Sequence, residues 1–263
     1  MADATPLPVL GAKRPRADGG FLWESIVNGP VRSRRLGTSV GLNLIPAGSK
    51  LCSFDCPYCE CGFNTPRALG ARWPSPDEVA HQLRRALERL PEPPDWITFA
   101  GNGEPTMHPR FPAVVDRVLA ARGARAPGAR VGILSNGLTA WRAPVRDALL
   151  RLDGRMMKLD PGPPERVNGA RYDVDRVVAS YPALKPYTVQ AMVVRRADWD
   201  GSSEHALAEW LGLLRRAEPD AVHLYSLDRP PADPAVRNVP RERLTEMARA
   251  IRESLPRCVV DVF

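Results

Sequence analysis

The sequence predicts an α/β fold, a partial (βα)6-type TIM barrel of parallel strands. Two observations carry this prediction. Short apolar segments alternate with amphipathic segments from about residue 39 onward, and this alternation is typical of βαβ units with a parallel sheet. Six or seven strand segments can be recognised, fewer than the eight of a complete barrel.

The first strand is expected at residues 39–45, and it leads into a loop that contains cysteines. The helix after that loop has the clearest start in the chain. Ser75 is a typical N-cap, Pro76 takes the first helical position, and Glu78 completes a capping box. This helix should run to about residue 90, because the proline that follows cannot continue it.

The later segments continue the alternation of strands and helices. Further strands are expected at residues 96–100, 130–134, 155–159, 188–194, 221–225 and 258–262. Helices are expected at residues 111–121, 143–152, 174–180, 204–216 and 242–255. Functional groups of such barrels gather at the carboxyl ends of the strands, so polar residues that directly follow a strand are candidates for the site.

Length and composition predict one domain. A chain of 263 residues, 44% of them hydrophobic, can bury the core of one domain. We expect this domain at residues 29–263, after a flexible arm at residues 1–28 that is rich in Pro, Gly, Arg and Ala. The arm lacks the apolar centre of a signal peptide, and no apolar run approaches the roughly 20 residues of a membrane helix. We therefore expect a cytoplasmic protein without a membrane partner.

The charge balance favours anionic partners. The formal net charge is +7, which suits nucleic acid, nucleotides or phosphorylated metabolites. Arg32, Arg34 and Arg35 form the most local basic cluster. Because guanidinium groups match phosphate oxygens, this cluster is either a phosphate clamp or a solvated, salt-bridged surface.

Three cysteines, Cys52, Cys56 and Cys59, occupy a C-x3-C-x2-C loop. A loop this short can bring three thiolates to one small object, and thiolates suit zinc or iron–sulfur clusters. Three ligands without a certain fourth leave one coordination position open, as a catalytic metal requires. Zinc is disfavoured because the sequence has no second C-x-x-C pair. Cys61 and Cys258 are interpreted as ordinary thiols.

This loop, with the aromatic Tyr58 before its last cysteine, resembles the signature of radical S-adenosylmethionine (SAM) enzymes. The resemblance implies a 4Fe–4S cluster held by Cys52, Cys56 and Cys59, with SAM chelating the fourth iron. It also implies a partial barrel and reductive cleavage of SAM to a 5′-deoxyadenosyl radical that abstracts hydrogen from a substrate. The electron donor would be a protein such as flavodoxin or ferredoxin. Tyr58 is expected on the nucleoside side of the SAM site.

The segment after the second strand supports the same resemblance. Gly101, Asn102, Gly103 and Glu104 are similar to the family's Gly-Gly-Glu segment, with an asparagine between the glycines. Glycines let backbone groups approach a ligand, and a carboxylate accepts hydrogen bonds from an ammonium group. The implied role of Glu104 is to hold the amino group of SAM.

Two later strand ends carry further candidates for SAM binding. Ser135 and Asn136 follow the third strand and are similar to family residues that bind the ribose or carboxylate of SAM. Lys158 and Asp160 follow the fourth strand. Each pair has an ordinary alternative, because Asn-Gly is common in turns and a lysine beside an aspartate can be a partial salt bridge.

The substrate stays open at this stage. Residues 29–37 and 224–232 resemble radical SAM proteins grouped with the wyosine-forming tRNA enzymes, but the upstream cysteines implied for a second cluster are missing before Cys52. The alternatives are RNA, as in a wyosine-like tRNA-modifying enzyme, and an anionic small molecule. A non-enzymatic zinc or iron–sulfur binding module is the third hypothesis. Candidate substrate contacts are His108, His223, Ser226, Asp228 and Arg229.

Overall fold

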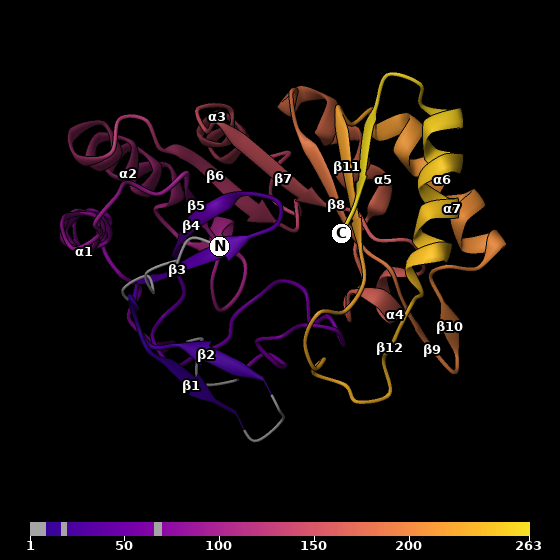
Figure 1. Cartoon of the computed structure of the whole chain (residues 1–263), viewed down its shortest axis with the longest axis horizontal. Helices are drawn as coiled ribbons and strands as arrows, with labels where there is room; N and C mark the ends of the chain where they lie inside the picture. The colour runs from indigo at the N-terminus through magenta and orange to yellow at the C-terminus, as the bar shows by residue number, and fades with distance from the viewer. Residues whose placement is uncertain (1–8, 17–19, 66–69) are drawn as a thin grey trace, which may run out of the picture.

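The computed structural model describes residues 9–16, 20–65 and 70–263 (Figure 1). Within these ranges the main sheet has eight strands: β3 (Val27–Ser33), β4 (Gly37–Leu42), β5 (Trp96–Phe99), β6 (Arg130–Ser135), β7 (Gly154–Lys158), β8 (Thr188–Met192), β11 (Ala221–Tyr225) and β13 (Val259–Val262). Neighbouring strands from β4 to β13 are parallel, and β3 lies antiparallel to β4 at one edge. The predicted α/β partial barrel is therefore confirmed.

Helices connect the strands and cover the outside of the sheet (Figure 1). They are α1 (Pro76–Glu88), α2 (Phe111–Arg125), α3 (Ala143–Leu150), α4 (Pro164–Val167), α5 (Val174–Ser180), α6 (Glu204–Ala217) and α7 (Arg241–Ser254), with 3-10 turns η2 (Pro105–Met107) and η3 (Tyr181–Leu184). The predicted capping box starts α1: Ser75 Oγ accepts a hydrogen bond from Glu78 N, and the Glu78 carboxylate accepts one from Ser75 N.

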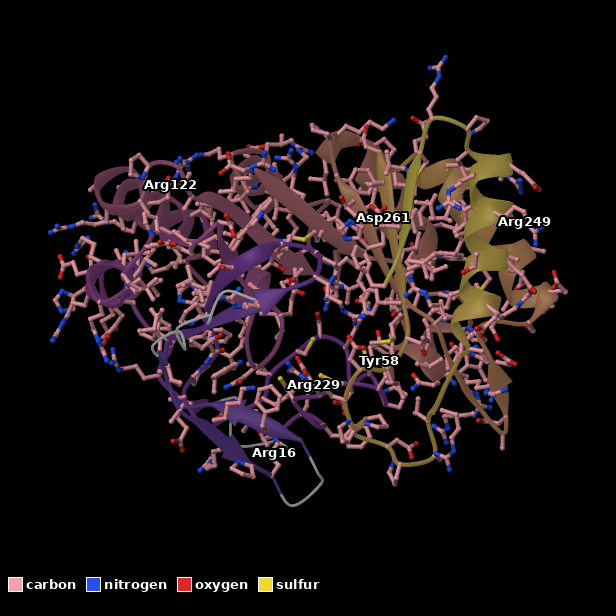
Figure 2. All side chains as sticks on the ribbon, viewed as in Figure 1. Arg16, Tyr58, Arg122, Arg229, Arg249 and Asp261 are labelled. Carbon is pink, nitrogen blue, oxygen red and sulfur yellow. The ribbon has the colours of Figure 1, made fainter. Side chains whose placement is uncertain are left out.

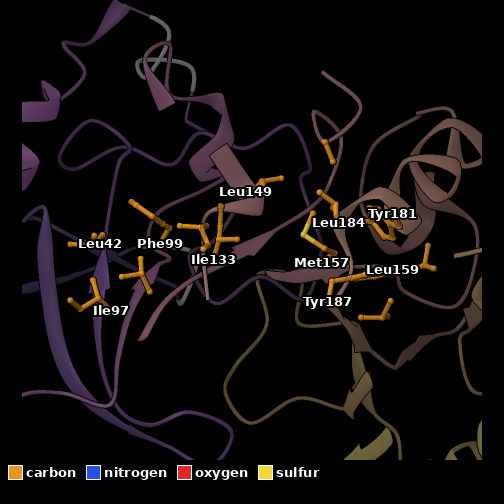
Figure 3. Packing of buried hydrophobic residues seen from close by; sticks show 14 of the residues in the cluster. Leu42, Ile97, Phe99, Ile133, Leu149, Met157, Leu159, Tyr181, Leu184 and Tyr187 are labelled. Atoms are coloured by element: carbon orange, nitrogen blue, oxygen red, sulfur yellow. The ribbon is translucent and has the colours of Figure 1, made fainter. Parts of the chain in front are cut away.

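Side chains alternate between the two faces of the sheet, as the period of a strand requires. The outward set is apolar and buried under the helices: Val40, Leu42, Ile97, Phe99, Val131, Ile133, Val189, Ala191, Val222 and Leu224. Figure 3 shows part of this core, from Leu42 through Ile133 to Met157. The inward set includes the polar residues Ser39, Thr98, Lys158, Gln190 and Tyr225, which line cavities. The barrel interior is thus built to hold a polar ligand.

Trp96 fills the barrel at the amino ends of the strands. A Cβ on Gly132 would lie 2.8 Å from the Trp96 ring, and one on Gly154 would lie 2.7 Å from it. Only glycine lets the indole cross these two strands. The ring therefore packs across β6 and β7, near the end of the barrel opposite the carboxyl ends of the strands.

The amino-terminal segment packs against the cysteine loop in the part that the structure describes. Residues 1–8 and 17–19 of the expected arm lie outside the described residues. Strand β1 (Lys13–Pro15) pairs antiparallel with β2 (Phe21–Trp23), and Phe21 N donates a hydrogen bond to the carbonyl oxygen of Glu60 at 3.1 Å. A flexible arm at residues 1–28 stays a prediction.

Several elements differ from the prediction, and β1, β2 and α4 are among those that were not expected. Strand β3 was not expected, because Gly29-Pro30 interrupts its alternation and shifts its register between Asn28 and Val31. The single strand expected at residues 188–194 ends at Met192. The chain then leaves the barrel as β9 (Val194–Arg196), which pairs with β10 (Trp199–Asp200) and β12 (Arg237–Asn238) in a small separate sheet.

Candidate active site

The cysteine loop follows β4 and is attached to the segment after β5. Leu51 N donates a hydrogen bond to Asn102 O at 3.2 Å, and Glu104 N donates one to Leu51 O at 3.2 Å. Leu51 and Gly103 form a parallel bridge. The two segments that the sequence singles out are therefore one structural unit at the carboxyl ends of the strands.

Asn64 shapes the loop around the first cysteine. Its side-chain oxygen accepts a hydrogen bond from Cys52 N at 2.8 Å, and its side-chain nitrogen donates to the carbonyl oxygens of Cys52 and Phe54, both at 3.0 Å. The carboxylate of Asp55 accepts a hydrogen bond from Asn64 N at 2.8 Å. These bonds fix the backbone on both sides of Cys52.

Three thiols lie near one buried cation. The side chain of Lys50 is 2% exposed, and its ammonium lies 3.8 Å from a carboxylate oxygen of Asp55. Burial lowers the pKa of Lys50, but Cys59, Cys52 and Cys56 raise it, with a smaller contribution from Asp55, and the net pKa lies above the ordinary value. The Lys50 ammonium therefore lies within electrostatic range of all three cysteine sulfurs. All five cysteines of the chain are free thiols.

This donor set fits a cluster better than a single ion. In the described part of the chain, no group of three or more His, Cys, Asp or Glu side chains is placed to hold one metal ion. A 4Fe–4S cluster sets a different requirement, because its cysteine thiolates bind separate irons of a larger object. Burial, followed by Cys59, raises the pKa of Cys56 to about 12. A hydrogen bond from Cys61 is the main cause that lowers the pKa of Cys59.

Asp160 connects the cysteine loop to β7 and β8. Its carboxylate accepts hydrogen bonds from Tyr58 Oη at 2.5 Å, Asn168 Nδ2 at 2.8 Å and Met192 N at 2.8 Å. Lys158 Nζ lies 3.1 Å from the same carboxylate and 4.9 Å from the centre of the Tyr58 ring. The lysine–aspartate pair is therefore real, and it also orients the aromatic ring beside the last cysteine.

Glu104 connects the ends of β5 and β6. Its Oε1 accepts hydrogen bonds from Thr106 N, Thr106 Oγ1 and Ser135 Oγ, and its Oε2 accepts one from Asn136 N at 2.7 Å. Burial, opposed by these donors, raises the pKa of Glu104. Asn136 Nδ2 in turn donates to Ser53 Oγ at 2.7 Å. Glu104, Ser135 and Asn136 thus meet beside the cysteine loop.

Comparison with known proteins points the same way as this geometry. The Radical SAM superfamily model matches residues 48–158. A UPF0026 protein of Methanocaldococcus jannaschii is 26% identical over 241 residues, which cover 87% of this chain and 72% of the relative. A UPF0026 protein of Synechocystis sp. is 30% identical over 205 residues, which cover 73% of this chain and 72% of the relative.

The chain belongs to the UPF0026 family. It carries a radical SAM domain and is a SAM-dependent enzyme, and this superfamily implies a 4Fe–4S cluster and SAM as cofactors. The expected likeness to the wyosine-forming group is not confirmed, and UPF0026 homologues are found instead.

A solved structure shares the fold of this chain. Streptococcus suis SuiB bound to S-adenosylmethionine superposes with a TM-score of 0.59 at 13% identity, covering 85% of this chain and 50% of SuiB. This chain therefore spans about half the length of SuiB, and at this identity the likeness shows the fold alone. Across the described ranges, this chain has no helix that combines the length and the apolar composition needed to cross a bilayer.

Two adjoining cavities connect the cysteine loop of this protein with the barrel interior. One has a volume of about 300 Å³ and the other about 350 Å³, and both are lined by Arg35, Gln190 and Arg229. The larger cavity also reaches Tyr58 and Cys59. Figure 2 shows Tyr58 and Arg229 close together on the side of the sheet where the loops gather.

Some predicted residues lie elsewhere. The side chain of Asn102 pairs with the backbone of Trp23, accepting from its N–H at 2.8 Å and donating to its carbonyl at 2.7 Å, so it holds β2 in place. His108 is buried and its Nε2 bonds to Pro74 O at 2.8 Å, outside both cavities. His223 also lies outside them, whereas Ser226, Asp228 and Arg229 line the larger cavity.

Proposed function

We propose that this protein binds a 4Fe–4S cluster through Cys52, Cys56 and Cys59 and uses it to cleave SAM reductively. The observation that carries this proposal is a loop with three free thiols that is hydrogen-bonded to residues 101–104 at the carboxyl ends of the strands. Thiolates are the usual ligands of such clusters, and three of them leave one iron for a substrate-derived ligand. When bound, the cluster supplies the electron that splits SAM into methionine and a 5′-deoxyadenosyl radical, which abstracts hydrogen from the substrate.

The residues around the loop would position SAM. Glu104 Oε1 already accepts three hydrogen bonds, but Oε2 accepts only one. A carboxylate has about four acceptor positions in good geometry, two on each oxygen. We therefore assign the remaining position on Oε2 to the ammonium group of SAM. The backbones of Gly101 and Gly103, with Ser135 and Asn136, would hold its polar groups.

Tyr58 would contact the nucleoside part of SAM. Its hydroxyl is held by Asp160, and Lys158 lies near its ring. With its hydroxyl bonded in this way, the ring has one fixed orientation toward the larger cavity. Lys158 and Asp160 would thus act mainly by fixing the ring.

The reaction also needs a reductant and a substrate. We propose a flavodoxin- or ferredoxin-type electron donor, and a reducing cytoplasm as the working compartment, since all five cysteines are free thiols. The substrate would enter the two cavities in the barrel. Identifying which hydrogen is abstracted requires deuterium transfer from candidate substrates into 5′-deoxyadenosine.

Cluster binding is tested by anaerobic reconstitution with iron and sulfide, followed by iron analysis and electron paramagnetic resonance of the reduced protein. Wild type should bind about four irons per chain. Cys56→Ala should lose the iron, whereas Cys258→Ala, a buried thiol beside β13, should keep it. Purification of the protein with one equivalent of zinc and no capacity for iron would contradict the proposal.

A further inference from the structure

The barrel interior holds polar groups that the proposed cofactor site leaves unused. The turn between β3 and β4 reaches across the open side of the barrel, where Arg34 forms an ion pair with Asp228. The guanidinium of Arg35 stacks on the ring of Tyr225, 4.6 Å from its centre, and lies 5.9 Å from the centre of the Phe263 ring. Stacking occupies the flat face of a guanidinium and leaves its N–H edge available for a ligand.

Three side-chain nitrogens that face this interior have no hydrogen-bond partner among the described residues: Arg35 Nη1, Gln190 Nε2 and Asn28 Nδ2. Gln190 and Asn28 are each 5% exposed, and all three residues line the smaller cavity. The orientation of the Gln190 amide is supported by Tyr225 Oη, which donates a hydrogen bond to Gln190 Oε1 at 3.4 Å. Buried donors without an acceptor are costly, so such a group indicates a missing acceptor.

The charge around Arg35 is also uncompensated. Two carboxylates line the cavities, but Glu60 pairs with Arg229 and Asp228 pairs with Arg34. In the described part of the chain, no ion pair involves Arg35. A cation and two amide donors therefore point into one cavity without an acidic partner from the protein.

We propose that Arg35 and Gln190 recognise an anionic group, a carboxylate or a phosphate, on the substrate of this enzyme. This assignment rests on the proposed function in taking the barrel cavity as the substrate site. Guanidinium and amide N–H groups match the oxygens of both anions. The anion would lie deep in the barrel, and the rest of the substrate would extend toward the cysteine loop through the larger cavity.

The test uses the reconstituted protein with SAM bound, titrated calorimetrically with inorganic phosphate, pyrophosphate, acetate and succinate. Wild type should bind one of these anions at a single saturable site. Arg35→Met keeps the apolar contact with Tyr225 but removes the charge, and it should weaken binding at least about tenfold. Gln190→Glu has the same shape as wild type and should also weaken binding by adding a negative charge. Tighter binding of phosphates assigns a phosphoryl group, and tighter binding of acetate or succinate assigns a carboxylate.

Arg32→Met is the matched control, because Arg32 is exposed on the same hairpin and lines neither cavity. It should bind the anion as wild type does. The proposal is overturned if no probe saturates one site, if Arg35→Met binds like wild type, or if Arg32→Met loses as much affinity. It is also overturned if Arg35→Met weakens SAM itself, since Arg35 would then serve the cofactor. The protein could bind the anion through Arg35 and yet form no 5′-deoxyadenosine. That result would contradict the proposed function and support the anion site.

Discussion

Gly103 lies so close to Leu51 that a Cβ on Gly103 would be 1.8 Å from the Leu51 carbonyl oxygen. That oxygen accepts the hydrogen bond from Glu104 N. The contact joins the backbone just before Cys52 to the segment that carries Glu104. The position of the cysteine loop therefore depends on a residue without a side chain.

Gly103→Ala should displace the cysteine loop, because the added methyl group meets backbone that cannot move independently. We expect a loss of about 1–3 kcal/mol in the free energy of unfolding and the loss of most bound iron. Chemical denaturation and iron analysis measure both. Gly212→Ala is the control, because a Cβ on Gly212 in α6 meets nothing within 4 Å. It should stabilise the protein by about 0.5–1 kcal/mol and leave iron binding unchanged.

Asp160→Asn should destabilise the protein by about 3 kcal/mol, because the side chain of Lys158, 17% exposed, would lose its carboxylate partner. The double variant Asp160→Asn/Lys158→Met removes both charges and should recover part of this loss. Urea denaturation of wild type, Asp160→Asn, Lys158→Met and the double variant gives the interaction free energy between the two residues. If the losses in free energy of unfolding of the two single variants simply add in the double variant, the two residues do not interact.

Arg155→Met should cost about 2–4 kcal/mol of stability, because several carbonyl oxygens would lose a charged donor. The Arg155 side chain donates to the carbonyls of Leu149 and Leu152, at the end of α3, and to that of Pro186. Thermal and urea denaturation measure the change. Arg249→Met, an exposed position on α7 (Figure 2), should change stability by less than about 0.5 kcal/mol. Equal effects of the two substitutions would refute the role of Arg155.

Stability should fall in mild acid partly because of His108. Burial, with a smaller contribution from Arg110, lowers the pKa of His108 below its ordinary value of 6.5. Between these two pKa values the unfolded chain binds a proton that the folded protein does not. The contribution of His108 is therefore complete above pH 6.5 and is lost as the pH falls below it. Urea denaturation at about pH 7.5 and about pH 5.5 should show a larger decrease for wild type than for His108→Gln. The same decrease in both proteins would exclude His108 as a cause.

The local patterns of the sequence predicted much of the fold. The capping box at Ser75 marked the start of α1, and the ranges expected for α5 and β11 agree with the structure. Strand β3 was missed because a Gly-Pro pair breaks its alternation. The cysteine loop could be recognised because its ligands are close in sequence.

The rest of the site depends on contacts between distant segments. Asn64 acts on Cys52 through a folded loop, and nothing in its own neighbourhood indicates this role. Lys50 carries a weak signal as a lysine two residues before Cys52. Gln190 carries another, as a polar residue between Val189 and Ala191 in an apolar strand. That its amide nitrogen lacks a partner is evident only from the structure.

The central claim is that the three-cysteine loop supports reductive cleavage of SAM. The most direct measurement is the yield of 5′-deoxyadenosine, by liquid chromatography and mass spectrometry, after anaerobic reconstitution and addition of dithionite and SAM. Wild type and Cys258→Ala should both form 5′-deoxyadenosine, and Cys56→Ala should form none above the background of a protein-free sample. Equal yields from wild type and Cys56→Ala would contradict the account.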